Sequence, residues 1–396
     1  MQQQVANAAA AAPMGRKPIP MVTKLAYRNL FHDRMSLIVT LVGIVFSVVL
    51  IAVQFGLYIG SEVRIVQMID QSKGDLWVVP YATKSFDDPN YLEGREKYGI
   101  LSTPGIASVE ELVVSFVYWR RPTGGITAGL LIGSDTRTNK ALPWDLVEGS
   151  IESLNAPDAI AVDRTYFEVL GVGKLGDRAE INGNSVTIAA VTDNIRSFTT
   201  LPYIFVDRTL GRQLLGIAPD QSSYLVVNVA SGVNVEDARK ALLQRLPDVE
   251  VLSLQEFRKR SIDRWLFETG AGAALLTGAA LGLIVGVVIV AQTLYSSTKD
   301  HLNEFATLRA LGAPASYIIK VILMQATLSA LIGYALGITL SLVVIWVSRG
   351  EPSLLIVMTP NLALLLFVLT VGMCVFAAVC AIFKVIRIDP AVVFSR

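Results

Sequence analysis

The sequence predicts a membrane protein with four transmembrane helices and an α+β extracytoplasmic domain inserted between the first and second of them. The chain is 53% hydrophobic and only 17% charged, which is more apolar than an ordinary soluble domain. Its mean hydropathy is +0.52. Four long stretches lack Asp, Glu, Lys and Arg, and they cover Met35–Ser61, Thr269–Thr298, Val321–Ser348 and Pro352–Phe383.

The first residues of the chain differ in composition from the rest. Residues 1–21 are rich in Gln, Ala and Pro, which is typical of a disordered tail. The tail has no apolar core followed by a small-residue cleavage site, so we expect the first span to stay as both signal and anchor. Residues 22–61 then comprise an interfacial helix over Val22–Arg34, with Tyr27 and Phe31 paired at i,i+4, and the first span.

The apolar stretches are long enough to be membrane spans. A helix needs about 20 apolar residues to cross a hydrocarbon core of about 30 Å. We therefore expect spans over 35–61, 269–298, 321–348 and 361–383. The alternative, buried helices of a large soluble protein, is disfavoured because such helices are shorter and usually carry charge on one face.

Positive charge indicates the orientation of the spans. Five basic residues precede the first span, which favours a cytoplasmic N-terminus: Arg16, Lys17, Lys24, Arg28 and Arg34. With four spans, the loop 299–320 and the tail 384–396 are then cytoplasmic as well, and both are basic. The short loop 349–360 lies outside. The predicted location is the cytoplasmic membrane, with the N- and C-termini on the cytoplasmic side.

The outer segment, residues 62–268, mixes strand and helix signals. Short runs rich in β-branched residues predict strands over Asp75–Pro80, Leu112–Trp119, Ala159–Val162, Ser185–Val191, Tyr203–Val206, Tyr224–Val229 and Val249–Leu252. Helices are expected over Arg164–Leu170, Val235–Leu246 and Gln255–Phe267, the last of which we expect to run on into the second span. The alternation indicates an α+β domain whose two ends enter the membrane.

Several classes of function are disfavoured. The net charge is +1 and no basic stripe is interleaved with aromatics, so nucleic-acid binding is not expected. Two histidines and two cysteines, Cys374 and Cys380, form no metal-binding pattern. There is no catalytic constellation and no Walker A motif, so any ATP must be bound by another chain. Gly171, Gly173 and Gly176 match G-x-G-x-x-G, but they follow a helical segment, which indicates a helix C-cap and turns.

The second span carries Gly278, Gly282 and Gly286 at four-residue spacing. Such a strip lets helix backbones approach closely in lipid. It could serve helix packing inside one subunit or form a homodimer seam. No span has an ionisable residue at its centre, which disfavours ion-coupled transport.

The loop after the second span predicts a short amphipathic helix, with apolar residues at i,i+3 and Gly312 with Pro314 at its end. Its sequence, residues 303–313, resembles the "R-E-I/F-A-x-L-R/K-A-x-G-A" segment of ABC-transporter permeases of the MacB, LolC/LolE and FtsX type, and more closely the stand-alone DevC-type permeases. Asn303 stands where the family often has arginine. The start, residues 26–30, and the finish, residues 389–393, are also similar.

The resemblance implies a non-catalytic permease, seated as a homodimer on a separate ABC ATPase that binds ATP and Mg. It implies a coupling helix that docks on that ATPase and includes Leu302, Asn303, Glu304, Phe305, Leu308, Arg309 and Gly312. In such relatives ATP hydrolysis reshapes the outer domain, a mechanism called mechanotransmission. No cofactor is expected in this chain itself.

Three functions fit the resemblance. The first is export of an amphiphilic or peptide substrate with a periplasmic adaptor (membrane fusion protein) and an outer-membrane channel. The second is FtsX-like signalling, in which the outer domain activates a cell-wall hydrolase. The third is lipoprotein release, which usually pairs two different permeases. The large outer domain favours export.

Overall fold

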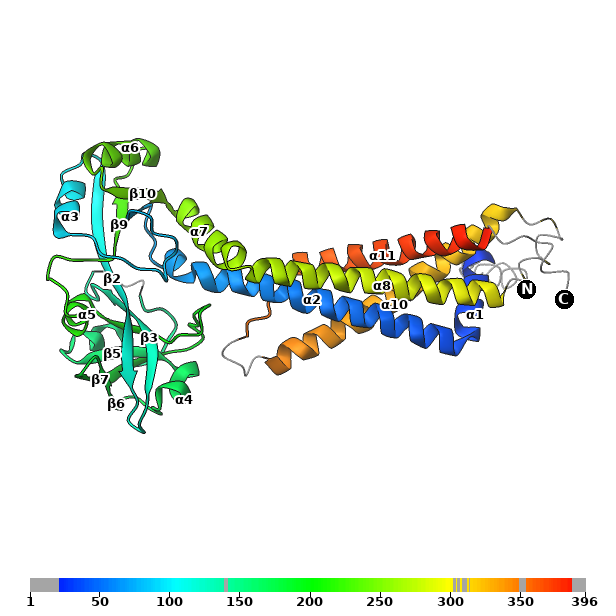
Figure 1. Ribbon diagram of the computed structural model, residues 1–396, viewed down its shortest axis with the longest axis horizontal. Coiled ribbons are helices and arrows are strands. Elements are labelled where there is room, and N and C mark those ends of the chain that lie inside the picture. Colours follow the sequence, from blue (N-terminus) through cyan, green and yellow to red (C-terminus); the bar gives the residue numbers. More distant parts are fainter. Residues whose placement is uncertain are drawn as a thin grey trace, which may run out of the picture. The chain divides into compact units, whose positions relative to one another are not determined.

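The computed structural model describes residues 21–138, 142–301, 304, 307, 312, 314–348 and 354–386. The chain divides into two compact units (Figure 1). We call the first the membrane unit, and it comprises Met1–Gln54, Thr277–Val344 and Met358–Arg396. The second, which we call the outer unit, comprises Phe55–Leu276 and Ile345–Val357.

Long apolar helices make up the membrane unit. The helices that contribute to it are α1 (Met21–His32), α2 (Arg34–Gln71), α8 (Ala271–Asp300), α10 (Ala315–Ser348) and α11 (Pro360–Ile386). Within the described residues, four of these helices are long and apolar enough to cross a membrane: α2, α8, α10 and α11. The predicted all-α membrane part of the fold is confirmed.

Helix α2 continues well past the apolar stretch that predicted it. The stretch ends at Ser61 because Glu62 and Arg64 follow, yet the helix runs to Gln71. The charged residues end the apolar stretch, but the helix itself continues. At its start, Asp33 separates α1 from α2 and its Oδ1 accepts a hydrogen bond from the Ser36 amide at 3.1 Å, as an N-cap does.

Small residues let the helices of the membrane unit approach closely. A Cβ atom built at Gly43 would lie 2.4 Å from Ile289 of α8, and one built at Gly333 would lie 2.5 Å from Ile44 of α2. The Tyr334 hydroxyl of α10 donates to the carbonyl oxygen of Ala363 on α11 at 2.9 Å. These contacts hold the helices together without a buried charge.

The outer unit is an α+β domain with a ten-stranded sheet in the described residues. Its strands are β1 (Leu76–Pro80), β2 (Ile106–Arg120), β3 (Ile126–Ser134), β4 (Leu146–Glu148), β5 (Ala159–Asp163), β6 (Arg178–Ile181), β7 (Asn184–Thr192), β8 (Tyr203–Asp207), β9 (Tyr224–Val229) and β10 (Val249–Ser253). Its helices are α3 (Gly94–Leu101), η1 (Ile151–Asn155), η2 (Arg164–Tyr166), α4 (Phe167–Leu170), α5 (Arg208–Leu215), α6 (Val235–Arg245), α7 (Leu254–Ile262) and η3 (Asp263–Glu268).

The long strand β2 belongs to both halves of this sheet (Figure 1). Its first part, Ile106–Leu112, pairs with β9, and its second part, Val113–Arg120, pairs with β3. Beyond β2 the pairings close on themselves in the order β2, β3, β8, β5, β7, β6 and back to β2. This half is therefore a small barrel, filled by apolar side chains such as Trp119, Ile160 and Ile204.

The other half is a layered sheet in the order β10, β1, β9 and β2. Alternate residues of β1 serve its two faces, as strand geometry requires. Leu76 and Val78 pack with residues of α3 and α6, including Ile100 and Leu242. Trp77 faces the opposite side, where it meets Phe257 of α7 with ring centroids 5.1 Å apart.

Every strand expected from the sequence is present, but the helix expected over Gln255–Phe267 is not continuous with the second span. It is α-helical only to Ile262 and then widens into the π-helical turn η3. Gly270 adopts a φ of +80°, a left-handed conformation that ends the helix before α8 begins at Ala271. That part of the prediction is wrong.

Candidate functional site

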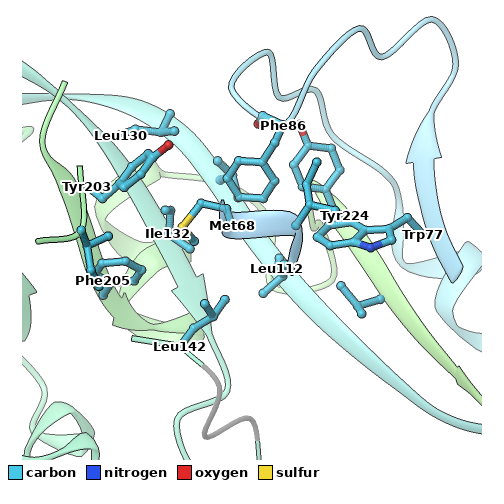
Figure 2. Close-up of a cluster of buried hydrophobic side chains, with 14 of the residues drawn as sticks. Met68, Trp77, Phe86, Leu112, Leu130, Ile132, Leu142, Tyr203, Phe205 and Tyr224 are labelled. Atoms are coloured by element: carbon cyan, nitrogen blue, oxygen red, sulfur yellow. Dashed lines mark hydrogen bonds between the residues drawn. The ribbon is translucent and has the colours of Figure 1, made fainter. Parts of the chain in front are cut away.

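The outer end of α2 is built into the core of the outer unit. Met68 is 1% exposed and Ile69 is fully buried, and both belong to one apolar cluster with Trp77, Leu112 and Tyr203. Figure 2 shows Met68 between aromatic and aliphatic side chains from the layered sheet and from the barrel. The last turn of the first long apolar helix is therefore a core element of the α+β domain.

The helical segment that leads to the second span, α7 with η3, packs against the outer end of α2. Leu266 of η3 is fully buried against Ile65 and Val66 of α2. Trp265 stacks obliquely on Phe198, with ring centroids 5.6 Å apart. We call residues 55–71 of α2 together with α7 and η3 the stalk.

The stalk has two arms, namely residues 55–71 of α2 and the segment α7–η3. Polar contacts join these arms to each other and to the rest of the outer unit. Arg258 of α7 pairs with both carboxylate oxygens of Asp70, at the end of α2. The Gln67 side chain donates from Nε2 to the carbonyl oxygen of Arg196 at 2.5 Å. On the far side of α7, Arg260 pairs with Glu250 of β10 at 2.6 Å. Displacing either arm would break these bonds.

A third segment, residues 354–357, packs on the stalk. The Val357 amide donates to the Gly56 carbonyl oxygen at 3.0 Å. A Cβ atom built at Gly60 would lie 1.9 Å from the carbonyl oxygen of Leu355, so only glycine fits there. The sequence offers one signal for this contact, because Gly56 and Gly60 stand at the same four-residue spacing as the glycines of the second span, but it does not show which segment packs on them.

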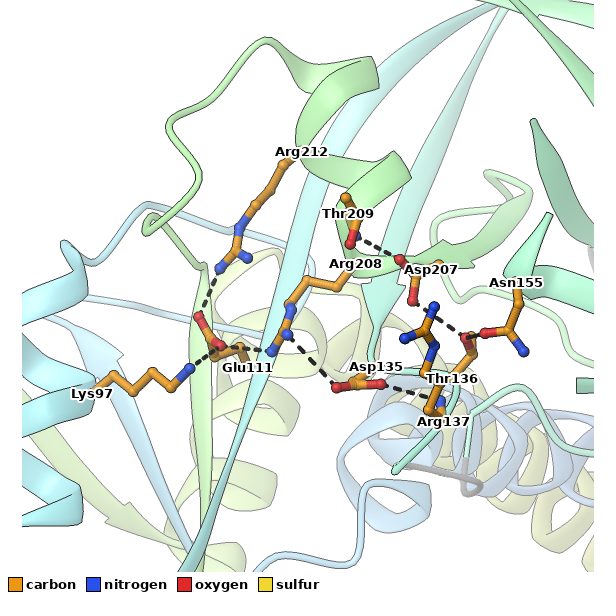
Figure 3. Close-up of polar contacts among 10 residues, drawn as sticks. All are labelled: Lys97, Glu111, Asp135, Thr136, Arg137, Asn155, Asp207, Arg208, Thr209 and Arg212. Atoms are coloured by element: carbon orange, nitrogen blue, oxygen red, sulfur yellow. Dashed lines mark hydrogen bonds and ion pairs between the residues drawn. The ribbon is translucent and has the colours of Figure 1, made fainter. Parts of the chain in front are cut away.

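An ionic cluster links the two halves of the outer unit (Figure 3). Glu111 of β2 is 4% exposed, and its carboxylate lies 2.6 Å from Lys97 of α3 and from Arg208 and Arg212 of α5. Burial by itself would raise the Glu111 pKa, but Lys97 and the two arginines together lower it below its ordinary value. Arg208 also pairs with Asp135, at 3.6 Å.

Most of the predicted coupling helix lies outside the described residues, namely Leu302, Asn303, Phe305, Leu308 and Arg309. Of the two that are described, Glu304 lies 3.2 Å from His301, measured from Oε2 to Nδ1. Gly312 has a φ of +94°, a conformation that favours glycine and is common at helix ends. The coupling role of this segment stays a prediction.

The glycine strip of the second span faces other helices of the same chain. A Cβ atom built at Gly278 would lie 2.6 Å from Gln54 of α2, and one at Gly282 would lie 3.1 Å from Leu50. At Gly286 it would lie 2.3 Å from the Met373 sulfur of α11. The glycine strip thus packs against helices of the same subunit. A homodimer interface would therefore have to include other residues.

The G-x-G-x-x-G match does not form a phosphate-binding loop. Gly171 is the left-handed C-cap of α4, with a φ of +69°, as the sequence predicted. The Gly173 amide already donates to the Asp177 carboxylate at 2.8 Å. In the part of the chain that the structure describes, no group of three or more His, Cys, Asp or Glu side chains is placed to hold a metal ion.

Comparison with known proteins gives two family matches. A model of the MacB-like periplasmic core domain matches residues 37–245, more than half of the chain. A model of the FtsX-like permease C-terminal region matches residues 276–390. Together the two matches include most of the first long helix, the outer unit up to α6 and nearly all of the three later apolar helices, whereas β10, α7 and η3 lie between the two matches.

Similar proteins carry permease names. An uncharacterized ABC transporter permease of Mycobacterium tuberculosis is 22% identical, over 93% of this chain and 98% of the relative. One of Methanocaldococcus jannaschii is 22% identical over 81% of this chain and 82% of the relative. The macrolide export ATP-binding/permease protein MacB of Sodalis glossinidius is 24% identical, over 80% of this chain but 51% of the relative. The crystal structure of the periplasmic region of MacB from Actinobacillus actinomycetemcomitans aligns with 49% of this chain and 96% of its own, at 13% identity and a TM-score of 0.38.

Four apolar helices, with an α+β domain inserted in the chain between the first and second of them, define a multi-pass membrane protein of the permease class. The chain belongs to the ABC transporter permeases of the MacB and FtsX type, which confirms the resemblance seen in the loop motif. Family and helices together imply a location in the inner membrane.

Proposed function

We propose that this chain is the transmembrane permease subunit of an ABC exporter and that it couples ATP hydrolysis in a separate ATPase subunit to movement of its outer domain. The observation that carries the proposal is the burial of Met68 and Ile69 in the core of the outer unit. A helix that ends inside a close-packed core transmits displacement to that core, because packed interiors are stiff.

The stalk supplies two such paths. One is α2, a helix without interruption from Arg34 to Gln71. The other is α7, η3 and α8, in which the π-helical turn and Gly270 give a point where the angle can change. We propose cytoplasmic termini, so that the loop 299–320 meets the ATPase, which binds ATP and Mg.

The wider assembly is part of the same proposal. The permease acts as a homodimer, seated on two ATPase subunits. Its substrate is amphiphilic or a peptide, and it works with a periplasmic adaptor and an outer-membrane channel. The name of the MacB relative, a macrolide export ATP-binding/permease protein, supports export as the class of activity.

The experiment measures nucleotide-dependent movement of the outer domain. Cys374 and Cys380 are replaced by alanine and a spin label is placed at Tyr98→Cys, which is 69% exposed on α3. The permease and its ATPase are reconstituted in nanodiscs, and the distance between labels on the two copies is compared with and without ATP. We expect the distance to change when ATP is bound.

A matched pair of variants tests whether the stalk carries this movement. Ser61→Gly with Glu62→Gly softens α2 within the stalk, at about 1 kcal/mol of helix propensity per glycine. Ser61→Ala with Glu62→Ala removes the same side chains but keeps the helix stiff. The glycine pair should abolish the distance change while ATPase stimulation persists, and the alanine pair should retain both. An unchanged response of the glycine pair contradicts the proposal.

Co-purification separates export from the two other functions. An adaptor bound to the extracted permease supports export. A cell-wall hydrolase bound to the permease supports signalling. The FtsX-like match over residues 276–390 is the reason to test for it. A second, non-identical permease supports lipoprotein release.

A further inference from the structure

Strand β10 is the end strand of the layered sheet, because among the described residues it pairs with β1 and with no other strand (Figure 1). The side chains of Val249 and Val251 belong to the apolar cluster on one face of the sheet, together with Leu242 of α6. Leu252 belongs to the cluster on the other face, together with Phe257 of α7. The two helices thus cover the two faces of the sheet at β10, and its outer edge lies between them.

This outer edge carries backbone groups that the sheet does not use. The Val251 carbonyl oxygen accepts a hydrogen bond from Nε of Arg239 at 2.9 Å, so the backbone groups of Val251 point away from β1. Those of Val249, two residues earlier, point the same way, because the direction alternates along a strand. Opposite Val249 stands Pro80, which has no N–H, as a pair without mutual hydrogen bonds allows. Among the described residues, the Val249 amide and carbonyl and the Val251 amide have no hydrogen-bond partner.

A groove of about 600 Å³ lies beside this edge. Its lining includes Leu243 of α6 and Pro247, which are both exposed and apolar. It also includes Tyr81, whose side chain is 77% exposed. All of the lining residues belong to the outer unit. The volume is in the range of ligand-binding sites, which is roughly 300–1,000 Å³.

The charges that line the groove are largely neutralised within the chain. Three ion pairs engage lining residues, namely Arg239–Glu256 at 3.1 Å, Arg260–Glu250 at 2.6 Å and Arg264–Glu268 at 2.9 Å. The other two charged lining residues, Lys259 and Asp263, have opposite signs. The groove therefore does not select a charged ligand. It presents backbone donors and an acceptor beside apolar side chains, and an extended peptide segment complements both.

Arg239 limits how long such a segment can be. Its guanidinium covers the Val251 carbonyl oxygen and pairs with Glu256 at the start of α7. Charged side chains protect natural sheet edges in this way against open-ended pairing. In an antiparallel pairing, one residue of the segment would exchange two hydrogen bonds with Val249, and a carbonyl two residues away would accept from the Val251 amide. The edge thus fits one short strand.

We propose that the edge of β10 binds a short, uncharged and partly apolar segment of a partner polypeptide as an added strand, with apolar side chains on Leu243 and Pro247. This interaction goes beyond the proposed export function and does not depend on it, because binding needs neither ATP nor the ATPase. Since α7 is part of the stalk, movement of the stalk would change one wall of the groove.

The probe for the test is a six-residue peptide of alternating threonine and valine, which is uncharged and favours the extended conformation. The peptide carries a fluorescent label, and its binding to the full chain in nanodiscs is followed by fluorescence anisotropy, with empty nanodiscs as the blank. A second peptide of the same sequence has every backbone nitrogen methylated. Two more peptides are methylated at alternate residues, one at the threonines and one at the valines.

We expect the parent peptide to bind saturably and the fully methylated peptide to bind at least tenfold more weakly, because methylation removes the donors and blocks close approach. One of the two alternate patterns should be tolerated, since every second amide of an added strand faces away from the edge. Raising the salt concentration from about 0.05 to about 0.5 M should change the Kd less than about twofold, because the groove's charges are paired.

A matched pair of variants tests the same bond on the chain. Val251→Pro removes the outward amide, and proline is tolerated where an edge N–H faces solvent. Val251→Ala also loses the buried valine side chain but keeps the amide. Val251→Pro should bind the parent peptide about tenfold more weakly than Val251→Ala, and thermal unfolding checks that both are folded. The methylated peptides probe the unaltered chain, so the test does not depend on either variant.

Four results would overturn the proposal. Failure of the parent peptide to bind saturably would show that the edge is closed. Equal affinity of the parent and fully methylated peptides would show that backbone hydrogen bonds play no part. Equal binding by the two Val251 variants would place the peptide elsewhere. A dimer that Val251→Pro dissociates and Val251→Ala preserves, on analytical ultracentrifugation, would assign the edge to a second copy of this chain. Since no ATPase is present, each of these results leaves the proposed energy coupling standing, and failure of coupling leaves the peptide result standing.

Discussion

Gly60 lies so close to Leu355 that a Cβ atom at Gly60 would be 1.9 Å from the Leu355 carbonyl oxygen. The neighbouring contact is also tight, because a Cβ atom at Gly56 would lie 2.5 Å from Ile356. The segment 354–357 thus packs on the stalk at two glycines of one face of α2.

The first prediction concerns this contact. Gly60→Ala should destabilise the chain by about 1–3 kcal/mol, the usual cost of overpacking, since the obstacle is backbone and cannot rotate away. The measurement is thermal unfolding in detergent, together with the rate of protease cleavage in the segment 354–357. Gly372→Ala is the control, because a Cβ atom there meets nothing within 4 Å. Equal stability of the two variants would show that the segment does not pack on Gly60.

The second prediction separates the two interpretations of the glycine strip. Gly286→Leu places a side chain against the sulfur of Met373 and the hydroxyl of Ser47, both in the same chain. We expect loss of the folded chain on size-exclusion chromatography and a lower unfolding temperature. Gly372→Leu should have little effect. A Gly286→Leu chain that stays as stable as the parent but becomes monomeric would instead assign the strip to a homodimer seam.

The third prediction concerns Glu111. Glu111→Gln leaves Lys97, Arg208 and Arg212 without their buried carboxylate, so we expect a loss of about 3 kcal/mol or more. The cost should appear as an earlier unfolding transition of the outer unit, followed by tryptophan fluorescence. Glu180→Gln is the matched control, because the Arg120–Glu180 pair is largely exposed and such pairs contribute about 0–1 kcal/mol. Similar losses in both variants would contradict a special role for the cluster.

The fold class and seven of the ten described strands of the outer domain could be predicted because their signals are local. Uncharged stretches mark the spans, and β-branched runs such as Tyr203–Val206 mark strands. Strand β3 was missed because glycines interrupt it. A Cβ atom at Gly129 would lie 2.8 Å from Ile204, so the strand needs glycine for a contact with a distant residue. No local pattern contains that information.

The stalk shows the same limit. The sequence predicts that both ends of the outer domain lie at the membrane. It also predicts that the first span ends at Ser61, because charged residues follow. That Met68 and Ile69 enter a core with Trp77 and Tyr203 depends on tertiary packing. Likewise, Lys97, Glu111 and Arg212 are scattered along the chain, and only the fold brings the two basic groups within 2.6 Å of the Glu111 carboxylate.

The fourth prediction is a pH dependence that arises from Asp87. Burial raises the pKa of this carboxyl to about 7 from its ordinary 3.8, although the Tyr203 hydroxyl donates to it at 3.3 Å. Between these pH values the folded chain holds a proton that the unfolded chain has released. The contribution of Asp87 to stability is therefore greatest at low pH and falls as the pH rises toward 7, by up to about 4 kcal/mol at about 1.4 kcal/mol per unit.

Asp87→Asn should remove most of this dependence, because the amide does not titrate. Unfolding of the outer unit is followed by fluorescence at pH 5 and at pH 8, with Trp77 close to the site through Phe86. The variant should gain stability relative to the parent at the higher pH. Asp88→Asn, at the exposed neighbouring position, is the control. The same slope in the parent and in Asp87→Asn would place the titration elsewhere.

The fifth prediction tests the coupling helix, whose key residue Phe305 lies outside the described part of the chain. If residues 302–312 dock in an apolar groove of the ATPase, Phe305→Ala removes the side chain that fills it, and buried aromatic anchors carry much of an interface's binding energy. Stimulation of the ATPase by the permease should fall at least tenfold, while membrane insertion and the unfolding temperature stay unchanged. Phe376→Ala is the control, since Phe376 is 59% exposed on α11, a different helix. Normal stimulation by the Phe305 variant would rule out the docking role. Comparison with the Ser61→Gly and Glu62→Gly pair shows which step each variant blocks. A defect at the ATPase contact should abolish both ATPase stimulation and movement of the outer domain. A defect in the stalk should abolish the movement alone.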